Sequence, residues 1–326
     1  MDSSYTYYTF QSRMLNLLAS IYHRLGEVKA RHLHHPDPQL HKAYQVSAVH
    51  ATLAIEGNVL DLLPMADLVA HHTSATSGPE AMEVMNTHHA LELLPDLEPS
   101  MASDLRQAHG ILMHGLSMDA GHFRTGPMEV MYGEPPPLRT APADNLPVHV
   151  EELLHFIEND DAPPIITSCL LHFGLVYLRP FSAGNGRMAR LWQRRVLMRH
   201  WPVFAFLPVE AFIYRTQTAY HASLEYADRQ GDCGGFIIYQ MERIDEALAE
   251  LLAARNPVLS ATDRVGLFLK HAPDRAFRRK DYMNVFPELS SPTASRDLRD
   301  AVDAQRLERT GVGRTAVYRR GARAVA

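Results

Sequence analysis

The chain has 326 residues, of which 46% are apolar and 21% are charged, a composition typical of a globular protein with a buried core. The 18 glycines and 21 prolines are too few for a collagen-like or disordered chain, and a net charge of −5 excludes a uniformly basic nucleic-acid binder. Two cysteines, Cys169 and Cys233, exclude a disulfide framework. With no CxxC or HExxH pattern, we expect no metal site of that kind and a reduced, cytoplasmic setting.

Apolar residues recur at three- and four-residue spacing through the first part of the chain, which predicts helices. The breaker His34–Pro38 separates the first two, and Gly57 is placed to end the second as a C-cap. The helices predicted here are Phe10–Leu25, Leu40–Ile55, Ala81–Leu94 and Asp104–Leu116.

The pattern changes after Gly121, where Met128–Tyr132 predicts a short β-run between turn residues. The most apolar stretch, Ile165–Leu178, has fourteen residues and is interrupted by Thr167, Ser168 and His172. A bilayer span needs about 20, so we expect a buried core helix and no membrane partner. The helices predicted beyond Gly121 are Pro147–Ile157, Pro164–Leu178, Gly186–His200, Val209–Asp228 and Gly234–Ala254.

The charge balance shifts near Pro257–Ala261. The residues from Ala261 onward hold 14 Lys and Arg against 8 Asp and Glu, a balance of +6. The preceding residues hold 18 against 29, a balance of −11. We therefore predict a domain boundary here, with a basic carboxy-terminal domain beyond it.

The stretch Leu178–Arg190, with the sequence LRPFSAGNGRMAR, carries the strongest functional signal. Gly184–Gly186 interrupts two helical patterns, and glycines at a helix start let consecutive N–H groups form an anion cradle. Arg187 and Arg190 lie three residues apart and share one helix face. This combination indicates a polyphosphate site. The alternative is a glycine-rich connection followed by a solvated basic turn.

This stretch resembles the motif HxFx(D/E)GNGRxxR of the Fic (Fido) family of protein adenylyltransferases. AIEGN, with Thr52 four residues before Glu56, resembles the family's inhibitory helix. Gly121–Met131 resembles the start of its β-hairpin flap, which holds a segment of a target protein. The resemblance covers most of the chain and implies that ATP or a related nucleotide binds at the loop. The matching motif positions are Phe181, Gly184, Asn185, Gly186, Arg187 and Arg190.

The resemblance implies a mainly α fold, in which a helical Fic core carries a short β-hairpin flap and a winged helix-turn-helix follows. We expect an N-terminal helical region over 1–100, with the inhibitory helix at about 40–57. The Fic core would then span 101–256, and the winged helix 260–326.

The reaction that the resemblance implies is transfer of AMP from ATP to a target hydroxyl, with magnesium neutralising the phosphates. A motif histidine takes the hydroxyl proton and an acidic residue holds the metal. This chain has Arg179 and Ala183 at those positions. Arginine cannot accept a proton near neutral pH, and loss of a general base costs on the order of 10²–10⁴ in rate. We therefore expect weak or absent catalysis, and no family-type magnesium site because Ala183 replaces the ligand.

Arg179 has two interpretations. It is either a cation placed against the dipole of the preceding helix, or a phosphate ligand in place of magnesium, which we favour. His172 lies two turns earlier, about 10 Å along the helix axis, and we expect it to be a packed core histidine rather than a substitute base.

The resemblance also assigns an inhibitory site. In the family an inhibitory glutamate, here Glu56, pairs with the second motif arginine, here Arg190, and blocks productive ATP binding. Thr52 and Gly57 complete this predicted site. The alternative is an exposed glutamate beside a glycine cap.

From Thr262 onward the pattern resembles a winged helix-turn-helix. Two short β-runs around Gly311 and Gly313 would form a basic wing. DNA is the partner that these arginines favour. Asp297, Asp300 and Asp303, on or near the third helix, dilute the basic face and keep a protein partner open as the alternative. The predicted helices are Asp263–His271, Arg279–Phe286 and Thr293–Gln305, and the predicted DNA-binding residues are Arg296, Arg299, Arg309 and Arg314.

Three functions fit this pattern. The first is a nucleotide-binding Fic protein that is poorly active or inactive and serves regulation. The second is an active protein adenylyltransferase with altered chemistry. The third is a transcriptional regulator whose Fic domain senses a ligand or dimerises. The sequence leaves the oligomeric state open, a homo-oligomer included.

Overall fold

The computed structural model describes residues 7–31, 33, 38–71, 78–127, 143–253, 261–271, 276–286, 289–311 and 316–321. The chain divides into two compact units, Met1–Ala253, the helical unit, and Ala254–Ala326, the carboxy-terminal unit. Helices dominate and the described residues form one small sheet, so the prediction of a mainly α fold is confirmed. None of the described helices combines the length and apolar character needed to cross a membrane.

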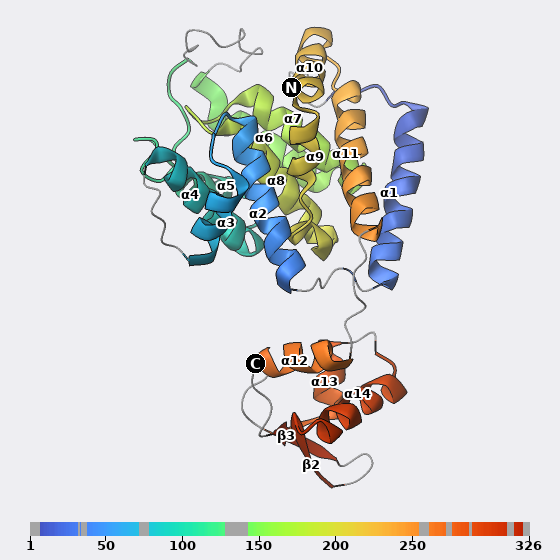
Figure 1. Cartoon of the computed structure of the whole chain (residues 1–326). Coiled ribbons are helices and arrows are strands. Elements are labelled where there is room, and N and C mark those ends of the chain that lie inside the picture. Colours follow the sequence, from blue (N-terminus) through green and yellow to red (C-terminus); the bar gives the residue numbers. More distant parts are fainter. Residues whose placement is uncertain are drawn as a thin grey trace. The chain divides into compact units, whose positions relative to one another are not determined.

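The helical unit is built around α7 (Pro164–Leu178) and α8 (Asn185–His200), which pack along each other. α7 is buried on almost every face because its residues are apolar all round, as expected for the central helix of a large core. Figure 1 shows α1 and α11 side by side at one edge of this unit. The other helices are α1 (Ser12–Ala30), α2 (Pro38–Ile55), α3 (Leu62–His71), α4 (Pro79–Leu93), α5 (Ala102–Leu112), α6 (Leu146–Asn159), α9 (Val209–Arg215), α10 (Gln217–Gln230) and α11 (Gly234–Ala253).

The predicted helix Val209–Asp228 is wrong in one respect, because Thr216 divides it into α9 and α10. The Thr216 hydroxyl lies 2.8 Å from the carbonyl oxygen of Phe212 and 2.8 Å from the hydroxyl of Tyr239. These contacts hold Thr216 outside helical geometry, at φ −124° and ψ 33°.

Three further predictions, of one helix, one helix end and one β-run, had different outcomes. The sequence pattern missed α3 altogether, and the predicted helix Asp104–Leu116 ends at Leu112. Gly57 ends α2 as predicted, with φ 91°, and its N–H donates to the carbonyl of Ala54 at 3.1 Å. The predicted β-run Met128–Tyr132 of the flap lies outside the described residues.

The carboxy-terminal unit packs three helices against a three-stranded antiparallel sheet of order β1-β3-β2. Strand β1, which pairs Phe277 with Tyr318 of β3, was not predicted. A separate apolar core that includes Phe268, Tyr282 and Leu298 holds the unit together. Its elements are α12 (Ala261–His271), β1 (Phe277–Arg278), α13 (Arg279–Val285), α14 (Ser291–Asp303), β2 (Leu307–Thr310) and β3 (Val317–Arg320).

Candidate functional site

The loop between α7 and α8 is closed by the side chain of Asn185. Its Oδ1 accepts from the N–H of Phe181 at 2.9 Å, and its Nδ2 donates to the carbonyl of the same residue at 2.7 Å. Gly184 precedes α8 in the left-handed region, at φ 74°, where a Cβ would also come within 2.8 Å of the sulfur of Met113. The loop is therefore fixed before any ligand arrives.

Arg190 is buried and held by α2. Its Nε donates to Thr52 Oγ1 at 2.8 Å, and its Nη2 donates to the Thr52 carbonyl at 3.0 Å and to Glu56 Oε1 at 2.7 Å. Burial raises the pKa of Glu56, but the charge and hydrogen bond of Arg190 outweigh it and leave that pKa below its usual range. The carboxylate therefore stays ionised at neutral pH.

Glu56 also faces the amino-terminal end of α8. A Cβ on Gly186 would collide with Glu56 Oε1, so the carboxylate lies directly against the backbone of the first turn. A helix amino terminus favours anions, because its first N–H groups point outward and its dipole is positive there. Glu56 therefore occupies a place where a phosphate group would be stabilised. Among the described residues, the backbone N–H of Gly57, the third residue assigned to this site, donates to the Ala54 carbonyl rather than to this site.

Arg187, one turn before Arg190, is paired with a different helix. Its Nη1 lies 3.1 Å from Glu83 Oε1 of α4. Both motif arginines thus carry a carboxylate partner from the amino-terminal part of the chain. The family resemblance had assigned a partner to Arg190 only, and Glu83 was not among the candidate residues.

His109 of α5 joins the loop to the turn at Gly121, and sequence reasoning missed it. The Gly121 N–H donates to His109 Nδ1 at 2.9 Å, so Nε2 carries the proton and donates to the Ala183 carbonyl at 3.0 Å. The imidazole is buried and stacks on Phe181, with centroids 3.6 Å apart and planes 5° apart. No local pattern signals this role, because the partners lie 12 and 74 residues away.

Arg179 ends α7 in the left-handed region, at φ 42° and ψ 63°. The carbonyls at this end of α7 are satisfied by Arg124, whose Nε donates to the Arg179 carbonyl at 2.7 Å and whose Nη2 donates to the Leu178 carbonyl at 3.3 Å. Arg124 thus supplies a cation at the helix end, the role that the first interpretation gave to Arg179. The Arg179 residue itself is half-buried beside the loop.

The residues around the loop do not fit a magnesium ion. Ala183, at the position of the acidic ligand, is exposed and has no side-chain oxygen. Asp119 is near, but one of its oxygens already accepts from Ser182 Oγ at 2.8 Å and from Ser117 Oγ. Within the described ranges no three His, Cys, Asp or Glu side chains are grouped as a metal site. The loop therefore has no carboxylate at the position of the family's metal ligand.

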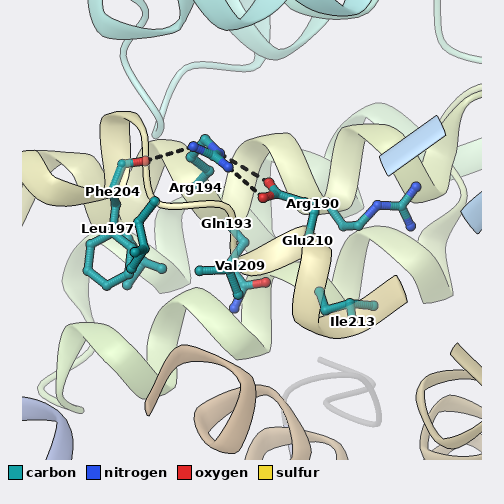
Figure 2. Close-up of a pocket in the computed structure, with 9 residues that line it drawn as sticks. Arg190, Gln193, Arg194, Leu197, Phe204, Val209, Glu210 and Ile213 are labelled. Atoms are coloured by element: carbon teal, nitrogen blue, oxygen red, sulfur yellow. Dashed lines mark hydrogen bonds and ion pairs between the residues drawn. The ribbon is translucent and has the colours of Figure 1, made fainter. Parts of the chain in front are cut away.

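A small cavity lies behind Arg190, between α8 and α9. Its volume is about 10 Å³, roughly the space of one water molecule, so it is not a nucleotide pocket. Two of its lining residues, Arg194 and Glu210, are joined by a double contact (Figure 2). This pair stabilises the packing of α8 on α9 rather than offering a site.

His172 is fully buried, as predicted for a core histidine. Its Nδ1 lies 2.6 Å from Gln193 Oε1 and its Nε2 lies 2.9 Å from the Tyr220 hydroxyl. Burial, together with the charge of Arg190, lowers the pKa of His172 from 6.5 to about 3. Burial likewise lowers the pKa of His109 to about 4. Both histidines are therefore neutral in the folded chain.

Because both histidines are buried and neutral, we expect the helical unit to lose stability in acid. The unfolded chain takes up protons at both below pH 6.5, whereas the folded chain does so only near pH 4 and pH 3. The free energy of unfolding should therefore fall, as the pH drops from 6 to 4.5, by about 1.4 kcal/mol per pH unit for each histidine. Urea unfolding at several pH values measures this slope. His172→Gln should remove one share of this slope, and an unchanged slope in that variant contradicts the prediction.

The predicted DNA-binding residues lie on the surface of the carboxy-terminal unit where they are described. Arg296 and Arg299 are exposed on α14, Arg309 is exposed on β2, and Arg314 lies outside the described residues. The expectation that Asp297, Asp300 and Asp303 dilute the basic face is wrong for Asp297 alone, because Asp300 and Asp303 are exposed. Asp297 is buried and accepts two hydrogen bonds from Arg264, at 2.7 and 2.8 Å.

Comparisons with known proteins agree with this geometry. A profile of the Fic/DOC family matches residues 99–197. The chain is 28% identical over 225 residues to "Protein adenylyltransferase Fic" of Nematostella vectensis, covering 65% of this chain and 50% of that protein. It is 29% identical over 222 residues to "Protein adenylyltransferase fic-1" of Caenorhabditis elegans, covering 63% and 41%. The chain thus spans half or less of the length of these relatives.

Solved structures extend the similarity to nearly the whole chain. A Fic family protein from Desulfovibrio desulfuricans G20 superposes with a TM-score of 0.71 at 30% identity, over 97% of this chain and 98% of that one. Fic-1 of Caenorhabditis elegans, residues 134–508, superposes with a TM-score of 0.60 at 22% identity, over 73% of this chain and 71% of that one. The second likeness concerns the fold alone.

Proposed function

Because this chain belongs to the Fic family, we propose that its loop Phe181–Arg190 binds ATP or a related nucleotide and that it transfers AMP poorly or not at all. One observation carries the proposal. The Glu56 carboxylate already sits where an anion is stabilised, against the first turn of α8 and on the buried Arg190. A phosphate group would take the same place when that carboxylate moves away.

The chain's own residues supply binding but not proton transfer. Arg187 and Arg190 present guanidinium groups from one face of α8, and the Gly184–Gly186 backbone forms the cradle. Arg179, at the position of the motif base, cannot accept a proton near neutral pH. We propose that it contacts a phosphate group instead, because the loop lacks a magnesium ligand at Ala183.

Titration with ATP, with and without magnesium, tests this function. We expect ATP to bind the wild-type chain without a requirement for magnesium, and Glu56→Gln to tighten binding by about tenfold because Arg190 is released. Arg190→Gln should abolish binding. Arg199→Gln removes a positive charge from an exposed position of the same helix and should change nothing. Strict dependence on magnesium would contradict the role proposed for Arg179.

The alternative is an active protein adenylyltransferase with altered chemistry, as the names of the curated relatives suggest. A proton acceptor would then have to come from the target or from water. His109 and His172 offer no substitute, because both are buried and both ring nitrogens of each are engaged in hydrogen bonds. The chain's residues therefore favour the poorly active form.

We further propose that the carboxy-terminal unit is a winged helix that binds DNA. The exposed Arg296 and Arg299 support this partner. The buried pairing of Asp297 with Arg264 takes one acidic group off the same surface, while Asp300 and Asp303 stay exposed on it. This function would make the chain a regulator in which nucleotide binding and DNA binding occur in separate units.

Salt dependence of DNA binding tests the second function. The full chain should bind duplex DNA with an affinity that falls steeply with salt. Arg296→Gln with Arg299→Gln should weaken binding and lower the salt slope by about 2, roughly one per lost phosphate contact. Arg13→Gln, at an exposed position of the helical unit, is the control. Absence of binding at low salt would refute this function.

Further partners are also proposals. A target protein would lie along Gly121–Met131, of which residues 121–127 are described. A homo-oligomer stays a proposal without a described interface. A cytoplasmic setting is consistent with Cys169 and Cys233, which are both free thiols.

A further inference from the structure

Glu83 is the carboxylate partner of Arg187, just as Glu56 is the carboxylate partner of Arg190. We infer that Glu83, positioned by Asn58, is a second inhibitory carboxylate, so that both motif arginines must exchange a carboxylate for a phosphate before a nucleotide is held. This inference rests on the proposed nucleotide site. It adds that Glu56 alone does not control that site.

Asn58 contacts Glu83 and lies two residues after Glu56 in the chain. Its Nδ2 donates to Glu83 Oε2 at 2.7 Å, and its Oδ1 accepts from the Leu60 N–H at 3.0 Å. Asn58 is also fixed to the end of α2, because its N–H donates to the Leu53 carbonyl at 3.1 Å. Only Gly57 separates it from Glu56 along the chain. A movement of the α2 end that withdraws Glu56 would therefore also withdraw the support of Glu83.

The exposure of the four side chains shows which partner can move. The side chains of Arg187 and Arg190 are 8% and 1% exposed, whereas those of Glu83 and Glu56 are 24% and 32% exposed. A buried guanidinium needs a counter-ion at all times, because an unpaired buried charge is strongly destabilising. The carboxylates can turn toward water. Exchange of the carboxylate for a ligand anion is therefore the favourable way to open the site.

The two motif arginines have N–H groups that could donate hydrogen bonds to a ligand with several oxygens. Among the described residues, Arg187 Nε and Nη1 and Arg190 Nη1 are buried and have no hydrogen-bond acceptor. The contact of Arg187 Nη1 with Glu83 is an ion pair without hydrogen-bond geometry. A buried donor without an acceptor is costly, and a polyphosphate presents many acceptor oxygens. The site thus fits a ligand that carries more than one phosphate group.

Titration with ATP of the full chain, its variants and matched controls tests the inference. We expect Glu83→Gln to tighten ATP binding at least about threefold in the Glu56→Gln background. Asn58→Ala, which leaves every charge in place, should act in the same direction. Glu92→Gln removes an exposed carboxylate from the same helix and should have no effect. The unfolding midpoint of each variant shows that it is folded.

Two results would overturn the inference. If Glu56→Gln binds ATP and Glu83→Gln adds nothing, or weakens binding in a folded chain, Glu83 only positions Arg187 and the proposed function stands. If no folded variant binds ATP, the proposed nucleotide site fails and the inference with it.

Discussion

Glu210→Gln is expected to lower the free energy of unfolding of the helical unit by about 3–5 kcal/mol. Glu210 forms a buried double contact with Arg194, whose Nη1 also donates to the Phe204 carbonyl at 3.0 Å (Figure 2). The amide carries no charge, so the guanidinium stays buried without a counter-ion. Urea unfolding followed by tryptophan fluorescence measures the loss in this unit alone, because both tryptophans, Trp192 and Trp201, lie in it.

Two control variants test whether the loss of stability comes from leaving a buried charge without a partner. Glu250→Gln breaks the pair with Arg215 on the surface, where both side chains are half-exposed, and should lower the same free energy by less than about 1 kcal/mol. Replacing Arg194 by Met together with Glu210 by Leu should recover most of the loss, because neither charge is then buried. A small effect of Glu210→Gln, or a double variant no more stable than the single one, would contradict this account.

The helices were predictable where their apolar pattern is long. α7 and α8 were anticipated closely, because one is the most apolar stretch of the chain and the other follows a glycine-rich start. The break at Thr216 was not, because no glycine or proline marks it and its partner Tyr239 lies on another helix. Strand β1 has two residues, too few for a periodic pattern, and exists through its pairing with β3.

The residues of the candidate site were likewise predictable only where they lie close together in the sequence. The loop Phe181–Arg190 is a local feature, and the sequence predicted its glycines and arginines as an anion site. The pairing of Glu56 with Arg190, by contrast, came only from the family resemblance. Glu83 and His109 were missed because their partners lie about 70 to 100 residues away along the chain, beyond any local pattern.

The largest effect on activity is expected from Arg179→His combined with Ala183→Asp. Histidine, with an ordinary pKa near 6.5, accepts a proton at neutral pH, and it tolerates the left-handed backbone of position 179. The aspartate returns a carboxylate that binds magnesium. We expect AMP transfer to rise by about 10²–10⁴ once Glu56→Gln also releases Arg190. Arg179→Gln combined with the same two changes supplies the metal ligand without the base and should stay inactive.

Transfer of labelled AMP from ATP, to the chain itself and to the proteins of a cell lysate, tests most directly whether this is a nucleotide-binding Fic protein that has lost its chemistry at two positions. The measurement compares the wild-type chain, Glu56→Gln, and Glu56→Gln carrying Arg179→His and Ala183→Asp. The account predicts weak or no labelling in the first two and clear labelling in the third. Labelling by the wild-type chain or by Glu56→Gln as strong as that of the third chain would contradict it.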